Sequence, residues 1–342
     1  MIPFMLFWTG IVGLVDVVVS SEIYHQMRTT QFATTRGEII SSSVETDHDS
    51  DGTTYRPKVA FEYDVNNQTL LGKSIRYGEA GSSDSYAHDF VANHPVGKKI
   101  DVHYDPSNPS DAVLVTGVEG SDLFLLMFLT PFNVVMLGGC YFLASTIKQL
   151  ITSGNSTRPC RYTDDGYEMR IMIDRVPLIP VVGISLLVLC FFSVFVVAFG
   201  TGLGFHPSMA TMLTTWSIIL SITTLVTAWF AKRNWTGHYD IVVHHLHKNV
   251  TLPVTHNRNR EVVIPTKNID QVYVDRNVTT DTDGDKHESF FVRIKIQPNS
   301  KTLAGKFTDN ETLAKLHDEE KAYQFADWFA GDVLNRKDLR VH

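Results

Sequence analysis

A long apolar hairpin constrains this chain more than any other feature. Val181–Gly200 contains no ionisable residue, the turn Thr201–Ser208 has the glycine and proline of a chain reversal, and Met209–Ala231 is apolar again. Each apolar run has about 20 residues, the length of a helix that crosses a hydrocarbon core of about 30 Å. Within lipid, a helix satisfies every backbone N–H and C=O group inside its own segment. We therefore predict two transmembrane helices, 177–200 and 209–231.

Two further segments are apolar enough to cross a membrane. The first, 1–21, lacks a basic n-region and a small-residue cleavage site, so we interpret it as an uncleaved anchor. It contains Asp16, and because an acid in lipid is costly and normally paired, we expect Asp16 at the outer interface or facing other helices. The second, 123–147, is interrupted by Pro131 and a glycine pair. The predicted fold class is an integral membrane protein, α+β, with four transmembrane helices.

Between the first two spans the hydrophobic period becomes that of strands. We predict a small β module over 22–122, with the turn signals Asp51-Gly52 and Asn66-Asn67. A short helix at 83–94, capped by Ser83, and a last strand at Lys99–Tyr104 complete it. The other strand candidates are Gly37–Val44, Lys58–Val65 and Gln68–Tyr77.

A second β-rich region, 237–342, follows the last span. A closing helix at about Asp318–Asn335 carries an apolar stripe, made of Ala322, Phe325, Ala326, Phe329 and Val333. The polar segment 148–176, between the second and third spans, is predicted to be a loop. The strand candidates of the second region are Tyr239–His247, Glu261–Pro265, Ile269–Asn277, Ser289–Gln297 and Thr302–Phe307.

Basic residues near the spans set the expected orientation. The loop 148–176 carries five of them, and Lys232 and Arg233 follow the fourth span, whereas the opposite side has Arg28 and Arg36. Because such residues favour the cytoplasm, we expect both termini, the loop and region 237–342 there, and the β module outside a plasma (inner) membrane. This assignment fails if the first span does not insert.

Charge balance and cysteine content exclude several classes of protein. Segment 22–122 has 16 acidic and 8 basic residues and segment 232–342 has 16 and 17, so neither resembles a nucleic-acid-binding domain. Cys140 and Cys190 lie in apolar runs, which leaves Cys160 alone in a polar loop. A disulfide framework and a redox pair are therefore not expected, and no cofactor is predicted.

The most specific motif lies at the end of the first β module, where residues 95–114 read PVGKKIDVHYDPSNPSDAVL. This stretch resembles a family of uncharacterised, mainly bacterial membrane proteins that share a domain of unknown function. The resemblance covers about residues 1–147 and implies an anchor helix, a small β module and a membrane setting, with no known activity. The motif residues matched here include Pro95, Gly97, Tyr104, Asp105, Pro106 and Pro109.

The same motif has a physical interpretation as a structural corner. Ile100, Val102 and Tyr104 alternate as one face of a strand, and the two prolines after them are expected to stop it, because proline removes a ladder donor and fixes φ. Region 237–342 is similar, in pattern only, to a bacterial pleckstrin-homology-like module, with strands followed by an amphipathic helix that carries Trp328. That resemblance implies docking to a partner.

An acidic turn is the first candidate metal site. Asp47, Asp49 and Asp51, followed by Gly52, begin a calcium-loop pattern, but the twelfth position is Lys58 where a bidentate Glu is required. An acidic hairpin turn explains these residues without a metal, so calcium is the weaker interpretation. A similar acidic turn contains Asp281, Asp283 and Asp285.

Histidines and hydroxyl side chains form two further candidate clusters. His245 and His247 would share one face of a strand as zinc ligands do, but exposed strand histidines explain them more simply; His244 and His256 lie nearby. The fourth span is rich in Ser and Thr, which can line a solute path or bond to their own helix and pack against a neighbour. Packing is the simpler interpretation.

The sequence shows no nucleophile elbow, phosphate loop or paired metal motif. We therefore predict a non-enzymatic binding or scaffolding protein that couples an outer β module to a cytoplasmic domain. Its expected partners are the lipid bilayer and a protein or a second copy of the chain. The alternatives are a small transporter or channel component, in which Asp16 would be required, and a membrane hydrolase, which requires a polar cluster that the sequence does not show. Ser82, Ser83, Asp84 and His88 are near one another in the sequence, but proximity of this kind does not establish a catalytic triad.

Overall fold

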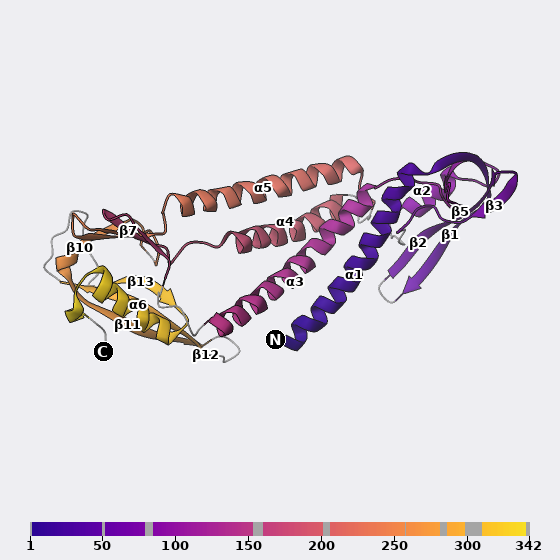
Figure 1. Ribbon diagram of the computed structural model, residues 1–342. Helices are drawn as coiled ribbons and strands as arrows, with labels where there is room; N and C mark the ends of the chain where they lie inside the picture. Colours follow the sequence, from indigo (N-terminus) through magenta and orange to yellow (C-terminus); the bar gives the residue numbers. More distant parts are fainter. Residues whose placement is uncertain are drawn as a thin grey trace. The chain divides into compact units, whose positions relative to one another are not determined.

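The computed structural model describes residues 2–49, 52–78, 85–152, 160–200, 206–256, 258–280, 286–297 and 310–339. The chain divides into two compact units, and we describe each by itself. The first unit contains Met1–Ser145 and Ile179–Val226, and the second contains Thr146–Leu178 and Thr227–His342. The elements are labelled in Figure 1.

Among the described residues, four helices are long and apolar enough to cross a membrane, as expected for a membrane protein. Three of them extend past the predicted spans, because polar residues continue each helix beyond its apolar run. The first ends seven residues later than predicted, the second begins three residues earlier and ends five later, and the last ends four later. Pro131 lies inside the second of these helices without ending it. The four helices are α1 (Ile2–Arg28), α3 (Gly120–Thr152), α4 (Leu178–Gly200) and α5 (Met209–Trp235).

The first unit contains a five-stranded antiparallel sheet in the order β3-β2-β1-β4-β5. Its two edges meet: Ser74 and Val113 form a parallel bridge, and the amides of Leu114 and Val115 donate to the carbonyl of Ile75 at 3.0 and 2.9 Å. The sheet therefore closes into a small barrel, with α2 (Tyr86–Asn93) between its third and fourth strands. The strands are β1 (Ala33–Asp49), β2 (Gly52–Val65), β3 (Gln68–Gly72), β4 (Lys99–Asp105) and β5 (Asn108–Val113).

Alternation along β2 builds the barrel core. Val59, Phe61 and Tyr63 point inward, and the residues between them face solvent or are half-buried. Gly72 lies opposite Phe61, where a Cβ atom would come within 2.3 Å of the Phe61 ring, so this position requires glycine. A β-bulge after Ile39 bends β1, and such bends help a sheet to close.

The motif at 95–114 forms two turns rather than one corner. Gly97 has φ +84° and donates its amide to the Ile39 carbonyl at 2.8 Å, which explains the glycine. We expected the two prolines to stop the strand, and β4 does end at Asp105, directly before Pro106, but Pro109 lies inside β5, which pairs antiparallel with β4. Asp105 makes this turn, since its carboxylate accepts hydrogen bonds from the Ser107 hydroxyl and amide at 2.6 and 2.8 Å, which lowers the pKa of Asp105. Pro109 is accommodated because it has no partner in the β4–β5 register and the contact that closes the barrel lies further along β5, at Val113.

The described part of the second unit contains two antiparallel sheets and the helix α6 (Glu319–Trp328), together with the ends of α3 and α5. One sheet has the order β10-β9-β8-β7-β6 and the other β11-β12-β13. Helix α6 begins at Asp318, whose carboxylate accepts from the Lys321 amide at 3.0 Å. The strands are β6 (Tyr162–Asp164), β7 (Glu168–Ile171), β8 (Ile241–His244), β9 (Asn249–Leu252), β10 (Val262–Pro265), β11 (Ile269–Thr280), β12 (Lys286–Ile296) and β13 (Asn310–Leu316).

The segment 148–176 differs from the predicted loop, because it contains β6 and β7. Strand β7 pairs with β8, with Glu168 opposite His244 and Ile171 opposite Ile241. Met169 and Ile171 enter the core of the second unit. The chain therefore leaves this unit after β7, forms α4 and α5, and returns to it at β8.

The predicted closing helix is largely confirmed, since its five apolar residues are all buried. The α-helix ends at Trp328 and continues as a π-helical turn, Phe329–Val333. Strands β9 and β13 were not predicted, and both are short or interrupted by charged residues. The predicted strand Thr302–Phe307, the Ser83 cap and the acidic turn at 281–285 lie outside the described residues.

Candidate functional site

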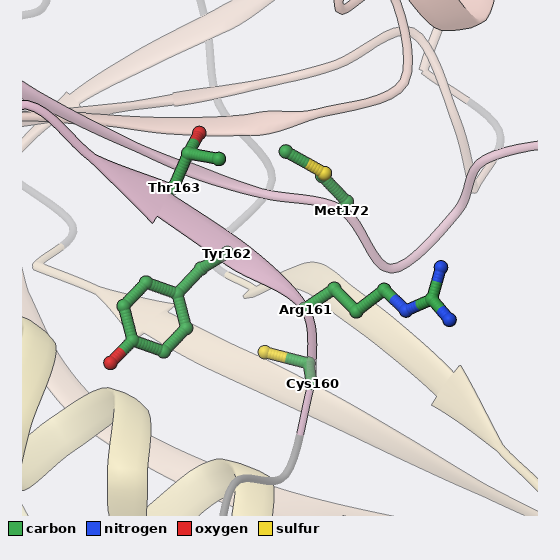
Figure 2. Close-up of a pocket in the computed structure, with 5 residues that line it drawn as sticks. All are labelled: Cys160, Arg161, Tyr162, Thr163 and Met172. Carbon is green, nitrogen blue, oxygen red and sulfur yellow. The ribbon is translucent and has the colours of Figure 1, made fainter.

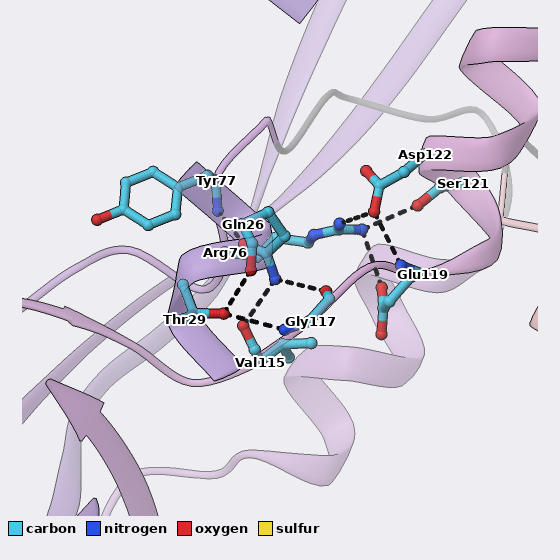
Figure 3. A network of polar contacts seen from close by, with 9 residues as sticks. All are labelled: Gln26, Thr29, Arg76, Tyr77, Val115, Gly117, Glu119, Ser121 and Asp122. Carbon is cyan, nitrogen blue, oxygen red and sulfur yellow. Dashed lines mark hydrogen bonds and ion pairs between the residues drawn. The ribbon is translucent and has the colours of Figure 1, made fainter. Parts of the chain in front are cut away.

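A fully buried side chain, Gln26, binds the carboxyl end of α1 to the barrel. Its amide nitrogen donates to the carbonyls of Val115 and Gly117 at 3.0 and 2.9 Å, and its oxygen accepts from the Tyr77 amide at 2.9 Å (Figure 3). Thr29, one turn later, donates to the Gln26 carbonyl and accepts from the Gly117 amide. Both donors of the Gln26 amide and its oxygen are thus used, which fixes this helix end.

A buried arginine binds the start of α3 to the same region. The Arg76 guanidinium is 7% exposed and donates to Glu119 at 2.9 Å, to the Ser121 hydroxyl at 2.8 Å and to Asp122 at 2.5 Å (Figure 3). The Asp122 carboxylate also accepts from the Glu119 amide at 2.8 Å, and an acid in the first turn suits the helix dipole. We call the contacts of Gln26, Thr29, Arg76, Glu119 and Asp122 the polar junction.

Tyr77 extends the polar junction to the β4–β5 hairpin. Its hydroxyl donates to the Asp111 carboxylate, and its ring lies 5.5 Å from that of His25. Burial, followed by the hydrogen bond to Asp111, raises the pKa of Tyr77 well above its ordinary value. The neutral phenol is therefore the form that the folded protein favours.

This pKa shift predicts how the first unit responds to alkali. Because the folded pKa is raised, the stabilisation is complete below the unfolded value of 10.0 and is lost as pH rises through the folded value. We expect Tyr77→Phe to cost about 1–2 kcal/mol at pH 8 and to lose less further stability between pH 8 and 11 than the wild type does. Melting curves at both pH values measure this, with Tyr24→Phe at an exposed tyrosine as the control. Parallel losses in all three proteins would contradict it.

The turn between α4 and α5 packs against the start of α3. A Cβ atom on Gly120 would lie 2.0 Å from the Pro207 carbonyl oxygen, so only glycine allows this contact. The Trp216 indole donates to the Leu123 carbonyl at 3.1 Å, and the rings of Tyr86 and His206 stack at 3.8 Å. These contacts add α5 and the α4–α5 turn to the elements held near the polar junction.

Asp16 lies inside α1 and faces α3. The Asn133 amide donates to its carboxylate at 3.0 Å, and Trp8 of α1 stacks on Phe132 of α3. Asn133 follows Asp122 by about 16 Å along α3, which is about half the thickness of a hydrocarbon core. The expectation that Asp16 faces another helix is met by this pair.

The Asp16–Asn133 pair predicts an asymmetry between two substitutions. Asp16→Leu removes the ionisable group, so we expect a change within about 1 kcal/mol, because hydrogen bonds between membrane helices are weak. Asn133→Leu leaves the carboxylate without its amide partner and should destabilise the protein more, by about 2 kcal/mol. Melting temperatures in one detergent rank the two variants. The reverse order would contradict this role of the pair.

A second set of polar contacts fixes the helix ends of the second unit. The Asn234 side chain, at the end of α5, accepts from the Val176 amide at 3.2 Å and donates to its carbonyl at 2.7 Å. The Arg175 guanidinium donates to both oxygens of Asp240 at 2.8 and 2.7 Å, and the Asp240 side chain is fully buried. The start of α4 and the end of α5 are therefore joined to each other and to the chain that enters β8.

The acidic turn does not form a metal site within the described residues. Asp47 is exposed on β1, Asp49 pairs in register with Gly52, and Asp51 lies outside the described part of the chain. In that part, no group of three or more His, Cys, Asp or Glu side chains could hold a metal ion. Calcium binding by Asp47, Asp49 and Asp51 stays a prediction.

The four histidines do not form one cluster, although the ring centroids of His244 and His247 lie 6.5 Å apart. Strand β8 ends at His244, so His245 and His247 lie in the following turn and do not share a strand face. His244, His245 and His256 each lie beside a carboxylate, of Glu168, Asp164 and Asp174, at 3.7, 3.2 and 2.9 Å. The His256 Nε2 atom makes no hydrogen bond within the described residues, although the Asp174 carboxylate lies 2.9 Å away.

Three hydroxyl groups of α5 bond to carbonyls of their own helix. Thr214, Thr215 and Ser217 donate to carbonyls four residues earlier at 2.8, 2.9 and 2.7 Å. This is the geometry of side chains that satisfy themselves in an apolar helix. The packing interpretation of this span is therefore favoured over a hydroxyl-lined path.

A pocket in the second unit is lined by Cys160, Arg161, Tyr162, Thr163 and Met172 (Figure 2). Burial raises the pKa of the Cys160 thiol to about 12, so the thiol is protonated at neutral pH and is a poor nucleophile. Of the four residues considered for a hydrolase, His88 contacts the Tyr55 ring, and Ser82, Ser83 and Asp84 lie outside the described residues. The pocket gives no support to a hydrolase.

Comparison with known families finds one match, which lies within the first unit. Residues 35–119 match the family described as a domain of unknown function (DUF3592). The match spans β1 to β5 and ends at Glu119 of the polar junction. It confirms that a domain of unknown function lies in this part of the chain. No curated protein and no solved structure matches.

The residues of the polar junction were not singled out from the sequence. Gln26 and Arg76 stand alone in their segments, and neither belongs to a motif that requires a partner. One signal was available: Glu119 and Asp122 immediately precede an apolar span, where a carboxylate is satisfied by the helix N-terminus or by a nearby base. Identifying Arg76 as that base requires the barrel to be folded.

Proposed function

We propose that this chain is an integral membrane protein that crosses the bilayer with all four helices and acts as a non-enzymatic scaffold. It would bind a protein partner and couple the barrel, outside the cell, to the second unit, in the cytoplasm of a bacterial cell. The observation that carries the proposal is the polar junction. Because buried side chains, and not a linker, hold α1 and α3 to the barrel, a displacement of the barrel moves both helices.

The barrel topology supports a binding role. Its strands follow the circular order 1-2-3-5-4, the closing contact is parallel, and a helix lies between the third and fourth strands. This arrangement corresponds to the OB-fold, a small barrel that commonly binds extended ligands. The support is by analogy of fold, since one fold carries many functions.

The second unit supports docking in the same way. A meander of five strands, β6 to β10, is followed by one of three, β11 to β13, and then by α6. Apart from β6, this order is similar to that of a pleckstrin-homology-like module, with α4 and α5 inserted between β7 and β8. Such modules commonly dock to partners, so each end of the bundle would present an interaction domain.

Photo-crosslinking in living cells tests the proposal. A photoreactive phenylalanine analogue is placed at exposed apolar positions of the barrel, Ile40, Leu71 and Val96, with Val196 of α4 as the lipid-facing control. We expect at least one barrel position to give a protein adduct of defined mass that the control lacks. The same probe at Leu246 and Val278 examines the second unit. Absence of protein adducts at all five positions would overturn the proposal.

A transport role is the second candidate, and the Asp16–Asn133 pair favours it. An ionisable residue at the depth of the bilayer centre often marks a solute or proton path. Transport predicts that Asp16→Asn abolishes solute or ion flux in reconstituted vesicles while the protein stays folded. The scaffold proposal predicts unchanged crosslinks in the same variant.

A further inference from the structure

The end of α5 carries aromatic and basic side chains that are not used within the fold. Trp229 is 49% exposed and Trp235 is 91% exposed, although tryptophan is usually well covered in folded units. Lys232 and Arg233 lie between them in the last turn. We call these four residues the basic end of α5.

The length of α5 places these residues at a membrane boundary. Trp229 follows Met209 by about 30 Å along the helix, which is the thickness of a hydrocarbon core. Lys232 and Arg233 lie about one turn further, at the depth of the lipid headgroups. The helix then stops in a Schellman motif, in which Gly237 has φ +71° and the amides of Gly237 and His238 donate to the carbonyls of Asn234 and Arg233.

The two basic residues of this segment have no acidic partner among the described residues, unlike their neighbours. Arg175 is held by Asp240 and Arg170 by Glu168, at 2.7 and 2.5 Å. The Arg233 guanidinium instead lies over the Trp229 ring, 3.9 Å from its centroid. Stacking on the ring leaves the edge of the guanidinium free to donate to a phosphate.

A purely structural account of these residues is incomplete. Basic side chains in a last turn favour the helix dipole, which explains Lys232 and Arg233. It does not explain two exposed tryptophans on either side of them. Indole rings prefer the boundary between headgroups and acyl chains, where one end of the ring is apolar and the other is wet.

We propose that the basic end of α5 binds the headgroups of anionic phospholipids in the leaflet at this end of the helix. Arg233 and Lys232 donate to the lipid phosphate, and Trp229 and Trp235 flank it at the boundary. The inference rests on the proposed insertion of α5 into the membrane. Beyond insertion, it states that the protein binds anionic lipid and names the residues that bind it.

Fluorescence quenching by brominated lipids tests this inference on the full chain. The protein is reconstituted in phosphatidylcholine vesicles in which either brominated phosphatidylglycerol or the same fraction of brominated phosphatidylcholine is present. We expect tryptophan quenching to be at least about twofold stronger with the anionic lipid, since each basic residue attracts such lipids measurably. The double variant Lys232→Gln/Arg233→Gln should be quenched equally by both lipids.

A matched control removes the same charge elsewhere in the second unit. Lys267→Gln/Lys295→Gln changes two exposed lysines and should keep the preference for the anionic lipid. Equal quenching of the wild type by both lipids, or an unchanged preference in the Lys232/Arg233 variant, would overturn the lipid site while leaving insertion intact. Absence of quenching by either lipid would overturn both the site and the proposed insertion.

Discussion

Replacing Arg76 with methionine will destabilise the first unit by about 3–5 kcal/mol, because it removes one partner of a buried ion pair. The side chains of Arg76 and Asp122 are 5% and 12% exposed, so the Asp122 carboxylate would be left largely out of water without its counter-charge. Glu119 contributes little to the loss, since its side chain is 41% exposed and can turn to solvent. Thermal unfolding in a mild detergent should show a decrease in melting temperature of roughly 10 °C.

A second substitution separates loss of charge balance from loss of packing. Arg76→Met/Asp122→Asn removes both charges and keeps an oxygen that can accept from the Glu119 amide. We expect it to recover about half of the lost stability or more, because removing both partners of a buried pair costs less than removing one. A single variant as stable as the wild type would show that the junction does not hold the barrel to α3.

Replacing Arg175 with methionine will have a similar effect on the second unit, about 3–5 kcal/mol. The Asp240 side chain is 0% exposed and would lose both of its bonds to the guanidinium. The Arg175 side chain is 35% exposed, so its guanidinium can be solvated when the Asp240 carboxylate is removed. Asp240→Asn should therefore cost less, about 1–2 kcal/mol.

The order of these two variants is the test. Unfolding followed by the fluorescence of Trp328, which packs on the core of the second unit, ranks them. Lys267→Gln, at an exposed position, is the control and should melt with the wild type. If Asp240→Asn destabilises the protein more than Arg175→Met does, the loss of stability does not come from a buried carboxylate without a partner, and the prediction is wrong.

The four long apolar helices could be predicted because their signal is local and long. Uninterrupted apolar runs identify a spanning helix with no knowledge of the rest of the fold. The ends of these helices could not be predicted. The largely polar segment 20–28 continues α1 after the apolar run and is held by the barrel. The apolar stripe of α6 was also predictable, because its period of 3.6 residues is a local signal too.

Strand pairing was less predictable because it depends on partners far along the chain. Strand β7 has four residues, two of them charged, and becomes a strand by pairing with β8 across the whole α4–α5 insertion. Strand β5 contains Pro109, which argues against a strand until the register with β4 leaves that position without a partner. Gln26 and Arg76 belong to the same class, since each is defined by contacts to residues more than 40 positions away.

The measurement that tests the central claim most directly is the side of the membrane on which each unit lies. In a chain whose Cys140, Cys160 and Cys190 are replaced by serine or alanine, single cysteines are introduced at Thr54 of the barrel and Lys267 of the second unit, both exposed. Sealed cells are then treated with a membrane-impermeant maleimide, before and after permeabilisation. We expect Thr54→Cys to react in intact cells and Lys267→Cys to react only after permeabilisation. Labelling of both positions from the same side would contradict a scaffold that couples the two faces of the membrane.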